Sequence, residues 1–193
     1  MVFCSGRWRT AWVVKDMRAI AAISRALLSG LTLSLGGCLV SEAVPPSPAT
    51  SAPMYDDLSG HNVKLNPQAA ASMISQYRRN NGLGAVTVDP ALMKLAEAQS
   101  RAMAAADRMD HDVRAPLAKR LMASGYPAGV AVENISAGYH TLAEAFSGWR
   151  DSPPHRANML KPGVTRLGIA TGYAPHSKYK VFWTMIMAST EQR

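Results

Sequence analysis

The sequence predicts an α+β domain in which helices cover both faces of a small, mainly antiparallel sheet, a three-layer α-β-α sandwich. Two observations support this fold class. Helix signals dominate the folded part up to residue 150, whereas residues 166–173 and 179–188 alternate in the manner of strands. Short extended stretches at 86–88 and 130–135 lie between the helices and add further strands to the sheet.

The expected helices have recognisable ends. Asn66-Pro67 and Asp89-Pro90 each place an N-cap residue before a proline at the first helical position. Thr141 with Glu144 forms a capping box. These signals, with Gly82 and Gly125 as stops, predict helices over residues 67–81, 90–109, 116–124 and 141–150.

The chain length and the net charge limit which functions are possible. The chain has 193 residues, enough for one domain and additional segments, and its net charge is +8. About half of that charge precedes Gly37, and the rest is scattered. This pattern argues against a nucleic-acid partner and allows weak attraction to anionic lipid or cell-wall polymers.

The first 37 residues have the organisation of a signal peptide. Arg18 and Arg25 accompany an apolar run that ends at Gly36-Gly37, and the run is too short to span a bilayer. Met17 is the better start, since it leaves a signal of ordinary length. We therefore expect residues 1–37 to be removed from an exported protein.

Cys38 follows the signal directly. Leu35-Gly36-Gly37-Cys38 resembles the lipobox of bacterial lipoproteins, which implies acylation of Cys38 and anchoring of the mature protein to a membrane of the cell envelope. The alternative is an ordinary secretory signal with a chance cysteine. Residues 38–60 are rich in Pro, Ser and Ala and predict a linker, which leaves 61–193 as the domain.

The segment from Trp149 to Leu160 carries the most specific motif. His155 lies on the first turn of a short helix, behind two prolines that stiffen its backbone, although a solvated surface histidine is also compatible with this position. The segment resembles the W-x-x-S-P-x-H-R-x-N-h-L signature, with h apolar, of bacterial CAP-domain (SCP-like) proteins. Four more family motifs occur in the expected order: the helix from Ala98 to Met109, Asp110-His111, Glu133-Asn134-Ile135 and Phe182-Trp183.

The resemblance covers residues 64–188 and implies a site. In the family, two histidines and acidic residues face a central cleft, which binds a divalent metal in some members. The matching positions are His111, Glu133 and His155. Ser152 stands where the eukaryotic branch has a second glutamate, so that the acidic set is incomplete, and Glu144 is better explained as a capping residue. Val132 and Pro154 replace glycines of the family pattern.

Two functions are compatible with such a cleft. Two imidazoles and a carboxylate suit zinc with one open position, which would allow a metal-dependent hydrolase acting on an envelope or extracellular substrate. The same groups also suit a hydrogen-bonded cleft without metal. No HExxH, GxSxG or Cys/His pattern supports a known hydrolase. We therefore expect a binding module for a lipid or small apolar ligand, a cell-wall component or a protein.

Overall fold

The computed structural model describes residues 52–60 and 63–190 of the chain. The predicted signal peptide, Cys38, most of the linker and His61 lie outside the described residues. Among the described helices, none combines the length and the apolar character needed to cross a lipid bilayer.

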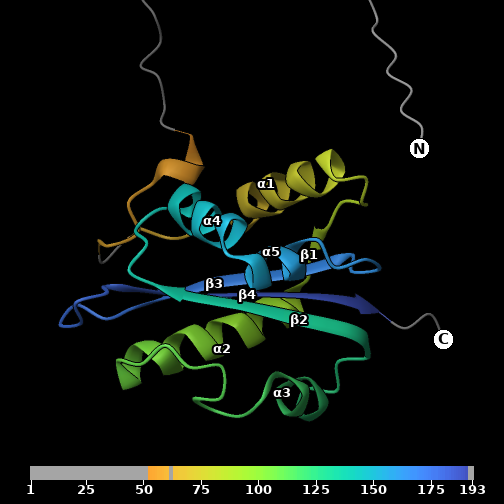
Figure 1. The fold of residues 1–193 in the computed structure, drawn as a ribbon. Coiled ribbons are helices and arrows are strands. Elements are labelled where there is room, and N and C mark those ends of the chain that lie inside the picture. The colour runs from red at the N-terminus through yellow and green to blue at the C-terminus, as the bar shows by residue number, and fades with distance from the viewer. Residues whose placement is uncertain (1–51, 61–62, 191–193) are drawn as a thin grey trace, which may run out of the picture. The chain divides into compact units, whose positions relative to one another are not determined.

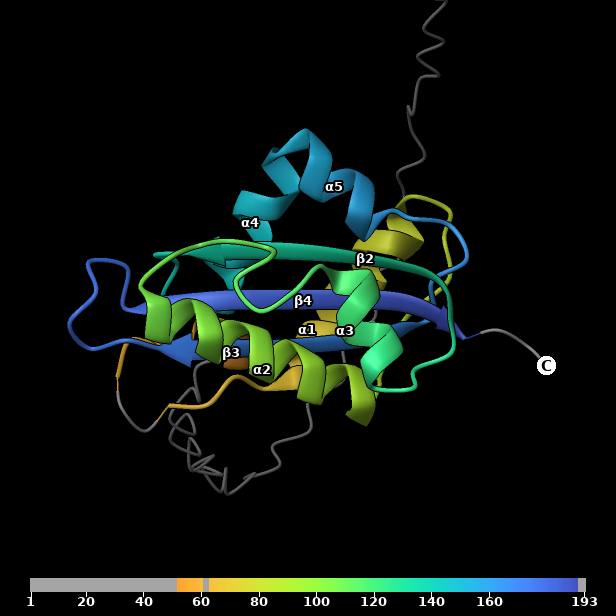
Figure 2. The ribbon, with the colours of Figure 1, turned by 90° about the horizontal axis from the view of Figure 1, so that it is seen from below.

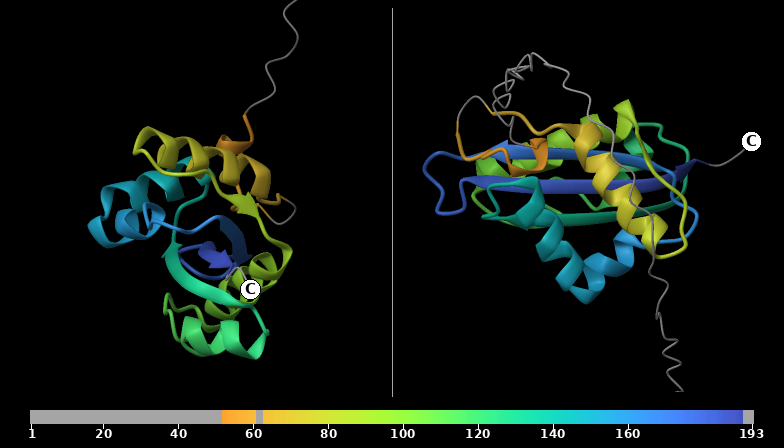
Figure 3. Two further views of the ribbon diagram at one scale, coloured as in Figure 1. Left: turned by 90° about the vertical axis from the view of Figure 1, so that its right-hand side faces the viewer. Right: turned by 90° about the horizontal axis from the view of Figure 1, so that it is seen from above.

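The fold has three layers, as predicted (Figures 1 and 3). The sheet has the strand order β1-β3-β4-β2, in which β1 runs parallel to β3 and the other neighbours are antiparallel. Its strands are β1 (Thr87–Val88), β2 (Ala128–Ala137), β3 (Arg166–Tyr173) and β4 (Val181–Thr190). The 3₁₀ helix η1 (Pro53–Tyr55), α1 (Pro67–Asn80), α4 (Leu142–Asp151) and α5 (Pro153–Met159) lie on one side of the sheet. The other side carries α2 (Pro90–Ala106) and α3 (Leu117–Ala123) (Figure 2).

The predicted caps are confirmed. The side chains of Asn66 and Asp89 accept hydrogen bonds from the first turns of α1 and α2, and Thr141 and Glu144 form a complete capping box. The predicted end of α2 near Met109 is wrong by three residues. The helix ends at Ala106 because Asp107 turns into the left-handed conformation at φ 46° and closes the last turn through its own N–H.

Glycines in β3 bring α2 onto the sheet without a layer of side chains. A Cβ added at Gly168 would lie 2.2 Å from the backbone carbon of Leu92, and one added at Gly172 would lie 2.3 Å from the carbonyl oxygen of Ser100. The helix backbone therefore rests directly on the strand backbone. The opposite face of the sheet packs by large side chains instead, including an edge-to-face contact between Trp149 and Trp183 at 6.3 Å.

A buried arginine joins α1 to the segment after α5. Arg78 is 1% exposed and donates to four backbone carbonyl oxygens, those of Gly84, Met159, Lys161 and Val164. The carbonyl of Met159 belongs to the last turn of α5, where the helix dipole favours a cation. Burial lowers the pKa of Arg78, although a guanidinium stays charged throughout the usual pH range.

Candidate functional site

Glu133, one of the three predicted site residues, lies on the edge strand β2. Its carboxylate is nearly inaccessible, with 3% of the side chain exposed. Oε1 pairs with Nδ1 of His111 at 2.8 Å, and Oε2 accepts from the guanidinium of Arg120 at 2.6 Å. Arg120 comes from α3 and also donates from Nε to the carbonyl of Ala115. The carboxylate therefore connects two segments that lie on the α2 side of the sheet.

The loop after α2 holds His111 in place. Gln99 on α2 donates from Nε2 to the carbonyl oxygens of both Asp110 and His111. The ring uses Nδ1 for Glu133, and about half of the side chain is exposed. The hydrogen bond to Glu133 raises the pKa of His111, and partial burial opposes this effect. The arrangement is an imidazole oriented by a buried carboxylate.

His155 reaches the same strand from the other layer. It lies in the first turn of α5, and its carbonyl oxygen accepts from Nδ2 of Asn134 at 3.0 Å. Asn158 of the same helix donates to the carbonyl of Glu133 at 3.0 Å and to Oδ1 of Asn134 at 2.9 Å. Burial lowers the pKa of His155, and the charge of His111 lowers it further.

The two histidines thus come from elements on opposite faces of the sheet. His111 and Glu133, two of the three residues predicted to converge, are in contact at 2.8 Å. No hydrogen bond links the His155 ring to either residue in the part of the chain that the structure describes, so the three-way convergence remains a prediction for His155. Ser152 begins α5 without a side-chain cap hydrogen bond. Of the other histidines, His140 is half-buried and His176 is exposed.

The donor set does not suit the predicted zinc site as it stands. Both oxygens of Glu133 are engaged, so a metal would have to displace His111 or Arg120 from them. Arg120 also places a buried positive charge beside the carboxylate. Among residues 52–60 and 63–190, no three His, Cys, Asp or Glu side chains are grouped to hold a metal ion. Glu133 acts here as an orienting group, and Glu144 is engaged in its capping box.

Four residues around Glu133 make contacts that the sequence did not predict: Gln99, Arg120, Asn134 and Asn158. A single arginine in a short helix has no signal of burial, because its partner is contributed by a different element. Asn134 and Asn158 both lie in the recognised motifs, but only the structure shows that they join α5 to β2.

Known proteins share sequence similarity with this domain. The family model described as CAP, the cysteine-rich secretory protein family, matches residues 71–187. The YkwD protein of Bacillus subtilis (strain 168), described as uncharacterized, is 29% identical over 111 residues, which span 56% of this chain and 43% of that protein. The chain therefore spans less than half of that relative.

Solved structures show the same fold. An extracellular protein containing an SCP domain from Bacillus anthracis str. Ames is 25% identical with a TM-score of 0.56, over 64% of this chain and 40% of that chain. An outer surface protein from Borrelia burgdorferi has a TM-score of 0.59 at 14% identity, over 67% of this chain and 98% of that chain. Since the family model covers more than half of the sequence, the chain belongs to the CAP family.

Proposed function

We propose that this chain is an exported binding module that holds the apolar part of an anionic amphiphile between α1 and α4. The observation that carries the proposal is a groove of about 730 Å³ between these helices and η1. Tyr77 and Phe146 meet edge to face at 5.4 Å in its wall. The other apolar lining residues are Pro53, Met54, Tyr55, Ala69, Met73 and Ala143. This volume and lining are typical of small-molecule sites.

The charge around the groove favours an anionic head group. Arg79 and Arg150 are exposed members of its lining, and the lining contains no acidic residue. Arg150 pairs with the exposed Asp151, a contact that is weak in water and free to rearrange. A single-chain amphiphile would bury its tail along Tyr77 and Phe146 and keep its head beside the arginines.

Affinity should rise steeply with the length of the ligand's chain. Octanoate, decanoate and dodecanoate titrated calorimetrically into the full-length protein should bind about tenfold more tightly for each two added methylenes, because each buried methylene contributes about 0.8 kcal/mol. Decanol, which lacks the charge, should bind more weakly than decanoate.

Filling the groove should abolish this binding. Ala143 is half-buried and lines the groove, so Ala143→Trp occupies its volume. The matched control is Ala106→Trp, at an exposed position at the end of α2 on the other side of the sheet. Equal binding in both variants, or an affinity independent of chain length, contradicts the proposal.

Export and anchoring complete the proposal. The lipobox-like segment before Cys38 and the extracellular or outer-surface descriptions of two relatives support a location in the cell envelope. Cys38→Ser should move the protein from the membrane fraction to the soluble fraction, and mass spectrometry of the mature wild-type N-terminus should show an acylated cysteine. A wild-type N-terminus without lipid contradicts this part of the proposal.

A metal-dependent hydrolase is less well supported, because both carboxylate oxygens of Glu133 already have partners, His111 and Arg120.

A further inference from the structure

The described chain begins at a wall of the groove between α1 and α4. η1 contributes Pro53, Met54 and Tyr55 to the lining of this groove, and Ala52 directly precedes η1. Cys38 lies 14 positions before Ala52, which is at most about 50 Å of extended chain. Because an acyl anchor on Cys38 would be tethered to the domain at η1, the groove side would be the first to reach the membrane.

An exposed aromatic ring marks the same wall. Tyr55 is 62% exposed, more than any other aromatic side chain among the described residues. The segment that carries it is held by the core, because Leu58 is buried and donates its backbone N–H to the carbonyl oxygen of His140, just before α4. A ring with an apolar body and a polar hydroxyl, fixed at the surface, suits the boundary between acyl chains and head groups.

Exposed arginines lie beside the groove on its helical side. Arg79 and Arg150 line the groove, and Arg156 donates from Nη1 to the carbonyl oxygen of Arg150 at 3.3 Å. The helices α1, α4 and α5 together hold four arginines and two acidic residues, whereas the acidic pair Asp56-Asp57 lies next to η1. The helical side therefore has net positive charge, and each arginine near an anionic membrane surface contributes about 1 kcal/mol to attraction.

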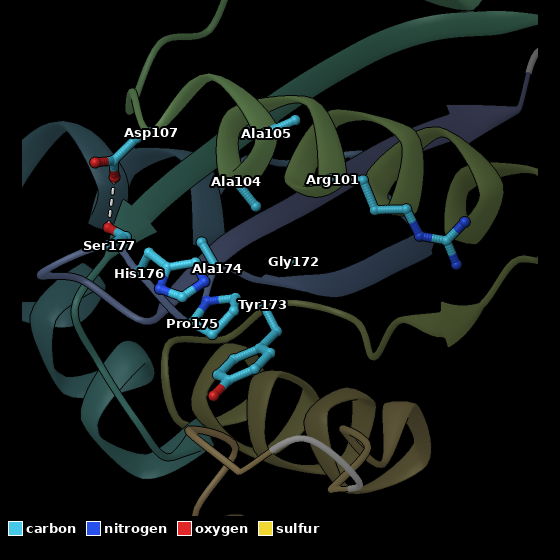
Figure 4. A pocket seen from close by; sticks show the side chains of 10 residues that line it. All are labelled: Arg101, Ala104, Ala105, Asp107, Gly172, Tyr173, Ala174, Pro175, His176 and Ser177. Atoms are coloured by element: carbon cyan, nitrogen blue, oxygen red, sulfur yellow. Dashed lines mark hydrogen bonds between the residues drawn. The ribbon is translucent and has the colours of Figure 1, made fainter.

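The other side of the sheet lacks this combination in the part of the chain that the structure describes. Its pocket at the end of α2 contains several small residues and the carboxylate of Asp107, which accepts a hydrogen bond from Ser177 (Figure 4). Met122 on α3 is 79% exposed, but α3 lies across the sheet from η1 (Figure 1). The start of the described chain, the exposed ring and the arginines thus coincide on the groove side.

We propose that the side of the domain formed by η1, α1 and α4 docks onto an anionic phospholipid membrane, with Tyr55 at the interface and Arg79, Arg150 and Arg156 facing the head groups. The inference rests on the proposed function, since it names the membrane as the source from which the groove takes its amphiphile. An acyl chain would pass from the bilayer to the groove without entering bulk water, where each exposed methylene costs about 0.8 kcal/mol.

The test places a tryptophan on each side of the sheet. Tyr55→Trp and Met122→Trp are made in the full-length protein, and the mature chains are reconstituted into vesicles of phosphatidylglycerol and phosphatidylethanolamine with brominated acyl chains. Trp149 and Trp183 are buried, so the wild-type protein supplies their constant emission as background. Bromine should quench the added emission of Tyr55→Trp at least about threefold more than that of Met122→Trp, because only position 55 reaches the interface.

A change of lipid and a second substitution test the role of charge. In vesicles of brominated phosphatidylcholine, which have no net charge, the quenching of Tyr55→Trp should fall by about half or more. Adding Arg156→Gln to Tyr55→Trp should lower the quenching in anionic vesicles. Adding Arg108→Gln should not, since Arg108 is an exposed arginine just beyond α2 that pairs with Asp110.

Four results would overturn the proposal: stronger quenching of Met122→Trp, equal quenching of the two variants, quenching that is unchanged in uncharged vesicles, or a mature wild-type chain without an acyl anchor. Calorimetry with decanoate in solution, with Ala143→Trp as the blocked variant, tests the groove alone. Decanoate binding without preferential quenching removes the docking and leaves the proposed function, whereas preferential quenching without decanoate binding removes the amphiphile. The two proposals can therefore fail separately.

Discussion

Replacing Arg78 by methionine should destabilise the protein by about 4 kcal/mol or more. Methionine fills similar space but donates no hydrogen bond, so four carbonyl oxygens, including those of Met159 and Val164, lose their partner. Each unsatisfied buried acceptor costs on the order of 1–3 kcal/mol, and entry of water recovers part of the loss. Since domains are stable by only about 5–15 kcal/mol, this loss removes a large share of the total stability, and Arg78→Met should unfold at a much lower urea concentration than the wild type.

The neighbouring arginine is a matched control. Arg79 is exposed and its side chain bonds to Gln76 on its own helix, so Arg79→Met should change the free energy of unfolding by less than about 0.5 kcal/mol. Urea denaturation followed by circular dichroism measures both variants. If Arg78→Met and Arg79→Met unfold at the same urea concentration, the hydrogen bonds of Arg78 do not hold α1 to the segment after α5.

Glu133→Gln should be the second most damaging change, with a loss of about 3 kcal/mol. Glutamine keeps the shape of glutamate but leaves the charge of Arg120 buried without a counter-charge. Removing one partner of a buried ion pair costs more than the pair itself is worth, so Glu133→Leu combined with Arg120→Met should recover much of the lost stability. The control is Glu97→Gln, which removes an exposed pair with Arg101 and should cost little.

The same variant should change how stability depends on pH. The hydrogen bond to Glu133 raises the pKa of His111 in the folded protein. This contribution to stability is complete below the pKa of histidine in the unfolded chain, and it is lost as the pH rises through the raised folded value. In Glu133→Gln the folded pKa should fall toward its ordinary value, and this part of the pH dependence should disappear. An NMR titration of His111 that is unchanged by Glu133→Gln would contradict the assigned cause.

Local signals explain why most of the fold was predictable. Asn66, Asp89 and Thr141 cap helices through atoms a few residues away, and the alternation over 166–173 matches β3. Such features depend on neighbours in sequence. The end of α2 was missed because periodicity continues past Ala106, whereas the backbone of Asp107 does not. That turn is accompanied by the contact with Ser177, 70 residues further along the chain.

The candidate site was only partly predictable, because its contacts join residues that lie far apart in the sequence. The family motifs identified His111, Glu133 and His155 as candidates, but the state of the Glu133 carboxylate depends on Arg120, which belongs to a different element. The groove depends on how α1 and α4 lie relative to each other, and that arrangement is a product of packing on the sheet. Side chains that meet across layers carry no signature in a single sequence.

The hydrogen bond from Asn158 to the carbonyl oxygen of Glu133 should also oppose aggregation between copies of the protein. That carbonyl belongs to an edge strand of ten residues, where a neighbouring molecule could otherwise add a strand and start a chain of copies. Asn158 occupies the middle of this edge and interrupts the row of acceptors. At high local concentrations this side chain should therefore protect the molecules from joining sheet to sheet.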